Sequence, residues 1–182
     1  MVTKKSYSTF LRIFAVALFL HLVMTLSLSA QYSPEVLKAA YLERITRFID
    51  WPLVYSVKDS SVFTVGVYED PDFIAALTEV FKDKTIKNKK VFIIKITIND
   101  QLELCDICYL SEKGRQVLSQ YIETANRQGV LLISEARDFG KAGIHINFYF
   151  DDDKLKFEIN RQSLDSGKFK VSSLLLKSSK II

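Results

Sequence analysis

Residues 62–68 have the sequence VFTVGVY, and residues 91–98 have the sequence VFIIKITI. Both stretches are rich in residue types that favour strands, and the second is almost continuously apolar, as in a strand that is buried on both faces. Between them, Asp70-Pro71 begins a helical stretch that runs to about Lys82. A strand, a helix and another strand in this order predict a crossover between parallel strands.

The same alternation continues through the middle of the chain. Residues 107–110 (ICYL) predict a short third strand, and Ser111 is placed to cap a helix that includes Tyr121. Gly129 is expected to end this helix, and residues 130–133 (VLLI) predict a fourth apolar strand. Strands that alternate with helices in this way indicate an α/β fold with a mostly parallel sheet.

The pattern changes in the C-terminal part of the chain. Apolar and polar residues alternate over residues 144–150 and again over residues 155–159, on either side of the acidic turn 151–153 (DDD). Two such runs around a turn predict an antiparallel β-hairpin at the edge of the sheet. The segment from Arg161 onward has helical character with an interruption near Gly167. Together these patterns predict a single three-layer α/β domain with a C-terminal hairpin.

The N-terminal segment has the three parts of a signal peptide. Lys4 and Lys5 form a basic start, residues 10–26 form an apolar run, and residues 27–30 (SLSA) offer small side chains for cleavage. This predicts a signal peptide over residues 1–30, a domain over residues 31–182 and a periplasmic location. The apolar run approaches the length that spans a membrane, so an uncleaved anchor is the alternative.

Most of the net positive charge of the chain lies in this segment. The 182 residues contain 25 Lys and Arg against 21 Asp and Glu. Three of the basic residues lie within residues 1–30, which contain no acidic residue, so residues 31–182 have 22 basic and 21 acidic residues. A nearly neutral domain gives no support for binding of nucleic acid.

The first helix after the leader is expected to begin at Ser33-Pro34-Glu35, which combine a capping residue, a proline suited to the first turn and an acidic side chain. Apolar residues then recur at helical spacing as far as Phe48. Trp51-Pro52 is expected to end the helix, because proline cannot continue it and restricts the residue before it.

The domain has little of the chemistry that an enzyme needs. His145 is the single histidine of residues 31–182, and the alternation of its strand predicts that it faces solvent. One histidine and two cysteines do not make a zinc site without a further ligand, and no G-x-S-x-G elbow is present for a serine nucleophile. The sequence therefore predicts no enzyme, no metal site and no cofactor.

Cys105 and Cys108 form a C-x-x-C motif, which in an exported protein can be a redox pair. In an extended strand their α-carbons would lie about 10 Å apart, beyond the roughly 7 Å that a disulfide can bridge. A bridge therefore needs a turn before the strand begins. A redox pair, a structural disulfide and two unbridged thiols remain as alternatives.

Several segments of the chain resemble the YfiR-like family of bacterial periplasmic proteins. The likeness extends in order over residues 35–178. It is carried by residues 37–42 (LKAAYL), 47–52 (RFIDWP), 65–68 (VGVY), 105–107 (CDI), 143–144 (GI), 156–160 (KFEIN) and 172–177 (SSLLLK), with Phe73 and Phe148.

The resemblance implies a non-enzymatic regulator. The namesake type represses an inner-membrane diguanylate cyclase by binding its periplasmic part, which lowers cyclic-di-GMP and biofilm formation, and other relatives act with sensor kinases. The better-known members bridge cysteines that are far apart in the chain, whereas this chain has only Cys105 and Cys108. The family's Gly-Gly before the hairpin is Ala142-Gly143 here, a minor difference.

We therefore expect a binding protein that contacts an inner-membrane diguanylate cyclase or sensor kinase, with no membrane span after leader cleavage and with homodimerisation left open. Exposed aromatic residues within a polar rim are typical of such surfaces. Core packing is the alternative for each candidate. The candidate partner-binding residues are Arg44, Trp51, Tyr109, Tyr149, Asn160, Arg161 and Leu176.

Two other hypotheses remain. A small-molecule sensor would bind its ligand at the carboxyl ends of the parallel strands, near Gly66, Ser111 and Ser134. A thiol oxidoreductase would use Cys105 and Cys108.

Overall fold

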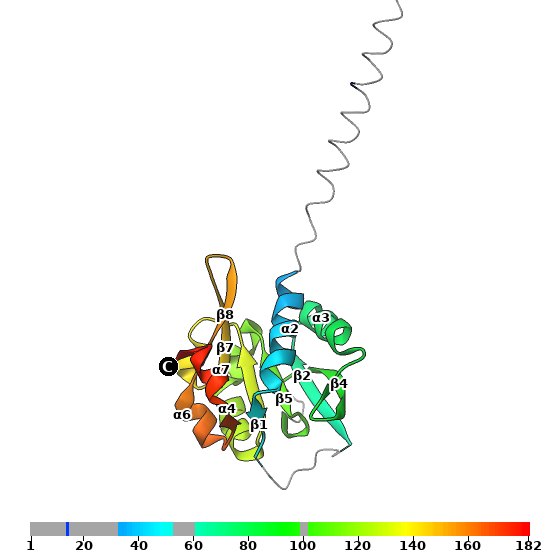
Figure 1. The fold of residues 1–182 in the computed structure, drawn as a ribbon. Coiled ribbons are helices and arrows are strands. Elements are labelled where there is room, and N and C mark those ends of the chain that lie inside the picture. The colour runs from blue at the N-terminus through cyan, green and yellow to red at the C-terminus, as the bar shows by residue number, and fades with distance from the viewer. Residues whose placement is uncertain (1–13, 15–32, 53–60, 99–101) are drawn as a thin grey trace, which may run out of the picture. The chain divides into compact units, whose positions relative to one another are not determined.

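The described residues form an eight-stranded, mostly parallel sheet with helices on both faces (Figure 1). The computed structural model describes Phe14 and residues 33–52, 61–98 and 102–182, so the predicted leader and its cleavage site lie outside the described residues. The strand order is β10-β8-β7-β6-β5-β2-β4-β3. The strands are β2 (Val62–Tyr68), β3 (Thr85–Ile86), β4 (Lys89–Ile96), β5 (Ile107–Leu110), β6 (Leu131–Ser134), β7 (Ile146–Asp151), β8 (Lys154–Ile159) and β10 (Lys180–Ile181).

The helices cover two separate apolar cores, one on each face of the sheet. Alternate residues of β2, β5 and β6 enter the first core with α2, α3 and α7, and the intervening residues of these strands enter the second core with α4 and α5. This arrangement confirms the predicted three-layer α/β domain. The helices are α2 (Pro34–Thr46), α3 (Pro71–Phe81), α4 (Leu118–Gln128), α5 (Phe139–Ala142), α6 (Arg161–Ser166) and α7 (Ser173–Lys177), with short 3-10 turns at Leu102–Leu104 and Glu112–Val117.

The order of the strands reverses beside β2. The chain passes from β2 through α3 to β4 on one side, and then returns to place β5 on the other side of β2. The connections after β2 and β5 therefore leave the sheet in opposite directions. This is the topological switch point at which open α/β sheets often bind ligands.

The first helix ends earlier than the sequence predicts. α2 stops at Thr46 rather than at Trp51-Pro52, and β1 (Ile49–Asp50) pairs antiparallel with β9 (Lys170–Val171). The indole N–H of Trp51 donates to the carbonyl of Asp106 at 3.0 Å. Pro52 also biases Trp51 toward an extended backbone. An extended backbone is compatible with strand pairing and not with a further helical turn.

The expectation that residues 91–98 are buried on both faces is wrong. Within β4 only Ile96 is buried, and Phe92 is 48% exposed. α3 packs against β4, and the neighbouring β3 pairs with only its first two residues. A strand next to the edge of the sheet can thus be almost wholly apolar without being enclosed.

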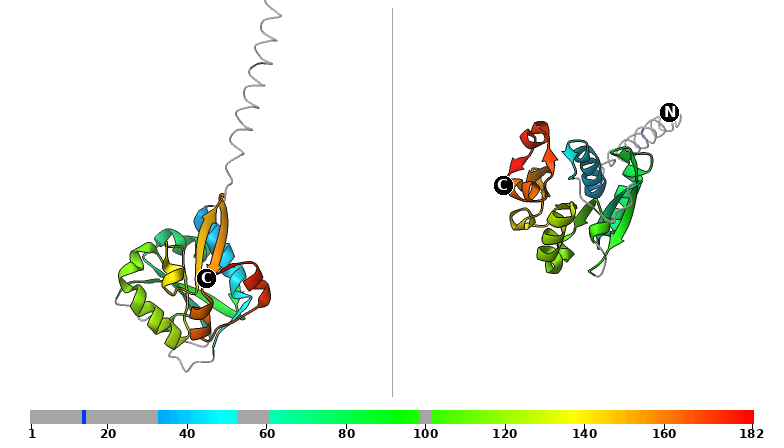
Figure 2. Two further views of the ribbon diagram at one scale, coloured as in Figure 1. Left: turned by 90° about the vertical axis from the view of Figure 1, so that its left-hand side faces the viewer. Right: turned by 90° about the horizontal axis from the view of Figure 1, so that it is seen from below.

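The predicted hairpin is present at the end of the sheet, where, among the described strands, only the two-residue β10 lies beyond it and pairs with the last two residues of β8. β7 and β8 pair along their full length, and Asp152 and Asp153 adopt left-handed conformations with φ of 48° and 57°. Such angles at both central residues suit a tight two-residue turn, and Figure 2 shows the hairpin extending from the rest of the sheet. β7 also pairs in parallel with β6, and β10 covers the far side of β8. The strand β10 is a feature that sequence patterning did not predict.

Candidate functional site

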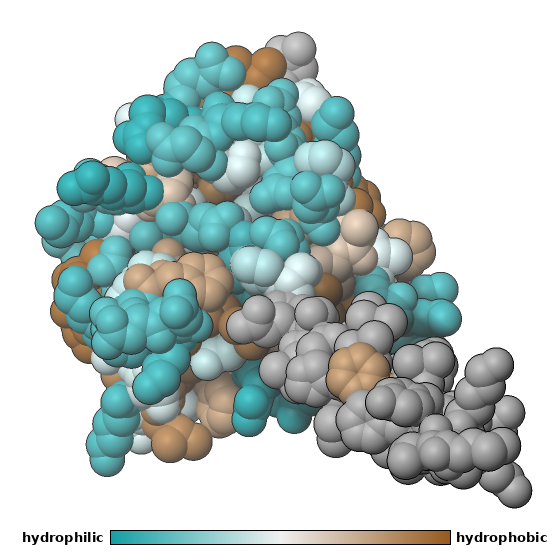
Figure 3. All heavy atoms as spheres, turned by 90° about the horizontal axis from the view of Figure 1, so that it is seen from above, coloured by the Kyte–Doolittle hydropathy of each residue, from teal (hydrophilic) through white to brown (hydrophobic). Residues whose placement is uncertain are grey.

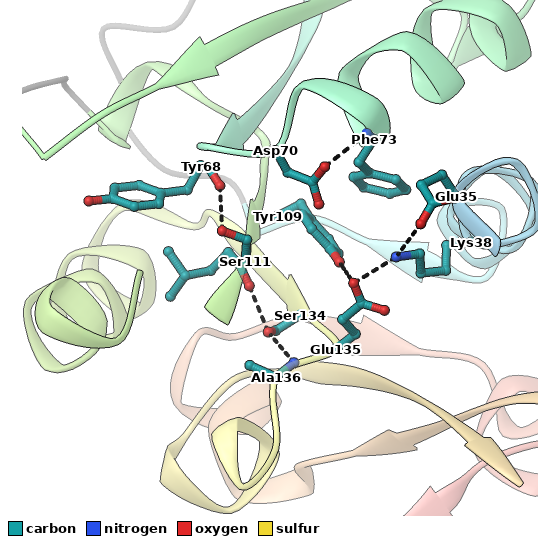
Figure 4. Close-up of polar contacts among 11 residues, drawn as sticks. Glu35, Lys38, Tyr68, Asp70, Phe73, Tyr109, Ser111, Ser134, Glu135 and Ala136 are labelled. Carbon is teal, nitrogen blue, oxygen red and sulfur yellow. Dashed lines mark hydrogen bonds and ion pairs between the residues drawn. The ribbon is translucent and has the colours of Figure 1, made fainter. Parts of the chain in front are cut away.

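A partly buried polar cluster lies at the carboxyl ends of β5 and β6, where Lys38 and Tyr109 are enclosed and Glu135 is 36% exposed (Figure 4). Glu135, the residue after β6, accepts two hydrogen bonds at its Oε1 atom. One comes from the Lys38 Nζ of α2 at 2.6 Å, and the other comes from the Tyr109 hydroxyl of β5 at 2.7 Å. One carboxylate oxygen therefore joins the first helix to two neighbouring strands.

Lys38 is the most enclosed charge of this cluster. Its side chain is 3% exposed, and its Nζ lies 3.7 Å from a carboxylate oxygen of Glu35. The ammonium also lies 5.5 Å from the centroid of the Phe73 ring and 5.8 Å from that of Tyr109. Carboxylates and aromatic faces together replace the water that a buried ammonium loses.

Tyr109 is a hydrogen-bond donor inside this cluster. The residue is fully buried, and its ring packs against Phe73 with the centroids 4.1 Å apart. Burial, followed by the charge and hydrogen bond of Glu135, raises the pKa of Tyr109 far above its usual value. The prediction that Tyr109 is an exposed contact residue is wrong, because its side chain points into the core that α2 and α3 cover.

Two serine hydroxyls close the switch point. Ser111 Oγ donates to the carbonyl of Tyr68 at 2.8 Å, and Ser134 Oγ donates to the carbonyl of Leu110 at 2.7 Å. Ser111 precedes the 3-10 turn of residues 112–117, but its hydroxyl makes no capping bond, contrary to the prediction. Each serine hydroxyl donates to the last carbonyl of the strand beside it in the sheet, where the parallel ladder stops.

The crevice expected of a small-molecule sensor is thus filled at its centre. Ser111 and Ser134 lie where predicted, yet their hydroxyls bond to backbone, and Tyr109 and Phe73 occupy the space beside them. Gly66 lies within β2 rather than at its end, where an added Cβ would meet Ile96 and Cys105. Among the described residues, a cavity of about 300 Å³ lies beside Asp70 and Lys113 and one of about 420 Å³ lies beside Glu135 and Lys180.

The predicted partner-binding residues fall in different places. Arg44 is exposed on α2 and lines a groove of about 200 Å³ with Phe48, Phe157 and Leu175. Leu176 follows in α7 and is partly buried against the first core. Arg44 and the α7 segment are therefore neighbours, although about 130 residues separate them in sequence.

Two of these candidates have evident structural roles. Trp51 makes edge-on contacts with Phe63 and Phe169, with ring centroids 5.1 and 6.2 Å away, in addition to its bond to Asp106. Asn160 caps α6 by accepting the N–H of Ser163 at 2.9 Å, and its amide donates to the Gly140 carbonyl. Both side chains stabilise the fold through these contacts.

The two remaining candidates lie near the C-terminal strand. Tyr149 is partly exposed on β7, and the Lys180 ammonium lies 6.0 Å from its ring centroid. Arg161 is exposed at the start of α6, where it pairs with Asp165, and its backbone N–H donates to the carbonyl of Ile182. The structure therefore places Arg44, Leu176, Tyr149 and Arg161 around residues 172–182, and places Trp51 apart from them.

His145 is fully buried, so the prediction of a solvent-facing histidine is wrong. β7 begins one residue later, and the His145 Nδ1 accepts the backbone N–H of Leu132 at 2.8 Å. Its Nε2 lies 3.0 Å from Asn126 Oδ1, and its ring packs edge-on against Phe169. Burial lowers the pKa of His145 to about 3, against a smaller opposing effect from the backbone of Ser163.

Comparison with known families adds a second line of information. The family model described as YfiR/HmsC-like matches residues 35–180. The chain belongs to this family. A search of curated proteins found no match. YfiR/HmsC-like membership indicates a periplasmic regulator of cyclic-di-GMP signalling, in agreement with the role that the sequence resemblance implied, and it identifies no particular partner.

Within this YfiR/HmsC-like fold, Cys105 and Cys108 are buried thiols that are not joined by a disulfide. Burial, followed by the proximity of Cys105, raises the pKa of Cys108 well above its ordinary value. A reactive thiol needs exposure and a lowered pKa. Here the Cys105 Sγ instead lies against the backbone of Gly66, where a side chain would leave no room for it.

We expect neither thiol to react in the folded protein. Iodoacetamide should alkylate Cys105 and Cys108 only after denaturant unfolds the chain, because the thiolate is the nucleophile and burial disfavours it. Mass spectrometry of protein treated with and without guanidinium chloride measures this directly. Rapid modification of either residue under native conditions would contradict the expectation and favour the thiol oxidoreductase hypothesis.

The part of the chain that the structure describes gives two further findings. It contains no group of three or more His, Cys, Asp or Glu side chains that could hold a metal ion. It also contains no helix that is both long and apolar enough to cross a bilayer.

The sequence analysis did not predict the contact between Lys38 and Glu135. Lys38 lies in a segment that carries the family resemblance, but an isolated lysine on a helix usually faces solvent. The signal for Glu135 was its place directly after an apolar strand, at the edge where parallel strands gather functional side chains.

Proposed function

We propose that the protein is a periplasmic binding protein that represses an inner-membrane signalling protein such as a diguanylate cyclase. The match of the YfiR/HmsC-like model to residues 35–180 carries this proposal. The predicted signal peptide of residues 1–30 supports it, since both imply export.

Repression by a binding protein requires a difference in affinity. The protein lowers the activity of its partner only if it binds the inactive state more tightly than the active one. For example, an equilibrium shift from mostly active to mostly inactive needs an affinity ratio of about 10⁴ between the two states. Contacts made in one state alone must therefore supply the effect.

The groove beside Arg44 is the surface that best suits this contact. It combines an exposed arginine with apolar side chains. Leu174, which precedes the lining residue Leu175 in α7, is 59% exposed. Arginine and large apolar side chains supply much of the energy at protein interfaces. In Figure 3 the visible described surface is largely hydrophilic with separate apolar patches, so a polar rim around small apolar contacts is the expected form of interface.

The proposal is tested by crosslinking in the native host. A tagged copy of residues 31–182, exported behind the native leader, would be crosslinked in cells and recovered from the inner membrane. We expect capture of a membrane diguanylate cyclase, and a rise in cyclic-di-GMP when the gene for this protein is deleted. Capture of a sensor kinase without a change in cyclic-di-GMP would show that the partner is a kinase and not a cyclase. Capture of no membrane protein would refute repression.

Reversal of the charge at Arg44 should weaken this capture. Arg44→Glu removes an exposed cation from the groove beside α7 and is expected to reduce affinity about tenfold or more, with little change in melting temperature. Arg127→Glu is the matched control, because Arg127 lies on α4 with a side chain that is 63% exposed. Equal capture by the two variants would show that the partner binds elsewhere.

A further inference from the structure

The cavity of about 420 Å³ beyond the carboxyl end of β6 has features of a ligand site. Its walls come from the loop after β6 and from β7, β8 and β10. The residues that decide its chemistry are Glu135, Asn147, Tyr149, Glu158 and Lys180. Its volume is within the range of pockets that hold small molecules.

One wall contains a buried acceptor that lacks a donor. Asn147 is 4% exposed, and its Oδ1 is buried without a hydrogen-bond partner among the described residues. An unpaired buried amide oxygen is destabilising, so native proteins rarely keep one without a reason. Asn147 lines the cavity, so a ligand N–H can reach this oxygen once the side chain turns toward the opening.

Glu158, the residue opposite Asn147 in the hairpin, also has no close hydrogen-bond donor for its carboxylate in the described part of the chain. Asn147 pairs in register with Glu158, whose side chain is 13% exposed. The Glu158 carboxylate has two contacts, each of 3.5 Å, with Asn147 Nδ2 and with Lys180 Nζ. Charge-assisted bonds to a carboxylate normally lie near 2.8 Å. Glu158 therefore retains most of its capacity to accept donors.

Three acidic and three basic side chains line the cavity, and the least exposed of these charges is the Glu158 carboxylate. Both hydrogen bonds of Glu135 use Oε1, so its charge is already paired with Lys38. Asn147 is buried and the Glu158 side chain is 13% exposed, whereas the Arg137 side chain on the same cavity is 93% exposed. A buried carboxylate distinguishes charge more strongly than a solvated guanidinium does.

Lys180 shows how a cation is held in this place. Its ammonium is near Glu158 and lies 6.0 Å from the centroid of the Tyr149 ring, which is within reach of a cation–π contact. The Lys180 side chain nevertheless remains 60% exposed, so its attachment is loose. A ligand ammonium can take the same position with shorter bonds.

We propose that this cavity binds a small organic cation, a primary amine or guanidine whose N–H groups bond to Glu158 and Asn147 and whose apolar body packs on Tyr149. The ligand displaces the Lys180 ammonium. This site goes beyond the proposed repression, because it would bind its ligand whether or not the membrane partner is present.

The test uses phenethylamine, which joins a primary ammonium to an aromatic ring. Its binding to the purified protein is measured by isothermal titration calorimetry, and 2-phenylethanol serves as the neutral analogue. We expect the amine to bind at least about tenfold more tightly than the alcohol, since a desolvated ion pair contributes about that much. Equal binding of both compounds, or binding of neither, would overturn the proposal.

Three variants assign the binding to particular residues. Glu158→Gln and Asn147→Leu should each weaken phenethylamine about tenfold, whereas Glu123→Gln, which removes an 80% exposed carboxylate from α4, should not. Lys180→Met should tighten binding several-fold, because it removes the competing cation.

The variants also separate binding from loss of structure. Leucine has the same branching as asparagine, although it is larger, and it leaves no orphaned oxygen, so Asn147→Leu should keep a melting temperature close to that of the parent protein. Unchanged or weaker affinity in Lys180→Met would overturn the proposed displacement. Failure of the partner pull-down has no bearing on these measurements, so the two proposals fail independently.

Discussion

Replacement of Glu135 with glutamine should lower the free energy of unfolding by about 2 kcal/mol, because it removes the charge that faces a buried ammonium, while the 36% exposure of Glu135 screens part of the effect. Among carboxylates, Lys38 would keep only the longer contact with Glu35 at 3.7 Å, together with its contacts to the Phe73 and Tyr109 rings. Its side chain is 3% exposed, so water cannot take the place of the lost carboxylate. Urea denaturation of the Glu135→Gln variant measures the effect.

The double variant Lys38→Met, Glu135→Gln identifies the cause. Removal of both charges leaves no uncompensated ion, so we expect it to recover most of the stability that Glu135→Gln loses. Asp50→Asn is the matched control, since Asp50 pairs with Lys87 at 3.0 Å but its side chain is 74% exposed. That surface pair should be worth about 1 kcal/mol or less. A double variant as unstable as Glu135→Gln alone would show that the buried charge is not the cause.

Acid should destabilise the protein through His145. Its pKa is about 3 in the folded state and about 6.5 in the unfolded chain, so the unfolded state binds more protons between these values. The stabilisation is complete above about pH 6.5 and is lost as the pH falls toward 3, at about 1.4 kcal/mol per unit. At about pH 4.5 the loss should reach roughly 2 to 3 kcal/mol. Protonation of Nδ1 would also break its bond with Leu132.

Comparison with His145→Asn separates this effect from that of the carboxylates. Asparagine can accept the Leu132 N–H but does not titrate, so the variant should be less stable at neutral pH and lose less stability on acidification. The measurement is the difference between the two slopes of unfolding free energy against pH. Parallel slopes would contradict a role for His145.

The strands at the centre of the sheet could be predicted from local pattern alone. The apolar runs that became β2, β5 and β6 are short, are bounded by turn signals and enter both cores, so propensity and burial agree. The pattern failed where tertiary contacts decided the outcome. Trp51 extends the chain by bonding to Asp106, which is distant in sequence, and no local periodicity contains that information.

The same limit applies to the polar residues. His145 continued an alternating run and so was expected on the solvent face, but its ring is enclosed by Asn126 and Phe169 from other elements. The pairing of Lys38 with Glu135 joins residues that are 97 positions apart. Sequence reasoning could name the edge of the sheet where Glu135 lies, but it could not predict which helix would bring a cation to it.

The short β1–β9 ladder has a consequence for the order in which the molecule assembles and loosens. Two residues at the end of the first helical segment pair with Lys170 and Val171, so this ladder closes a loop of about 120 residues with very few bonds. Closing such a loop has an entropic cost that two pairs of residues cannot offset alone. The ladder can therefore form only after the central sheet has brought both segments close together. The ladder should therefore be among the last contacts to form and the first to open, and α2 and the segment before α7 should gain or lose their order together.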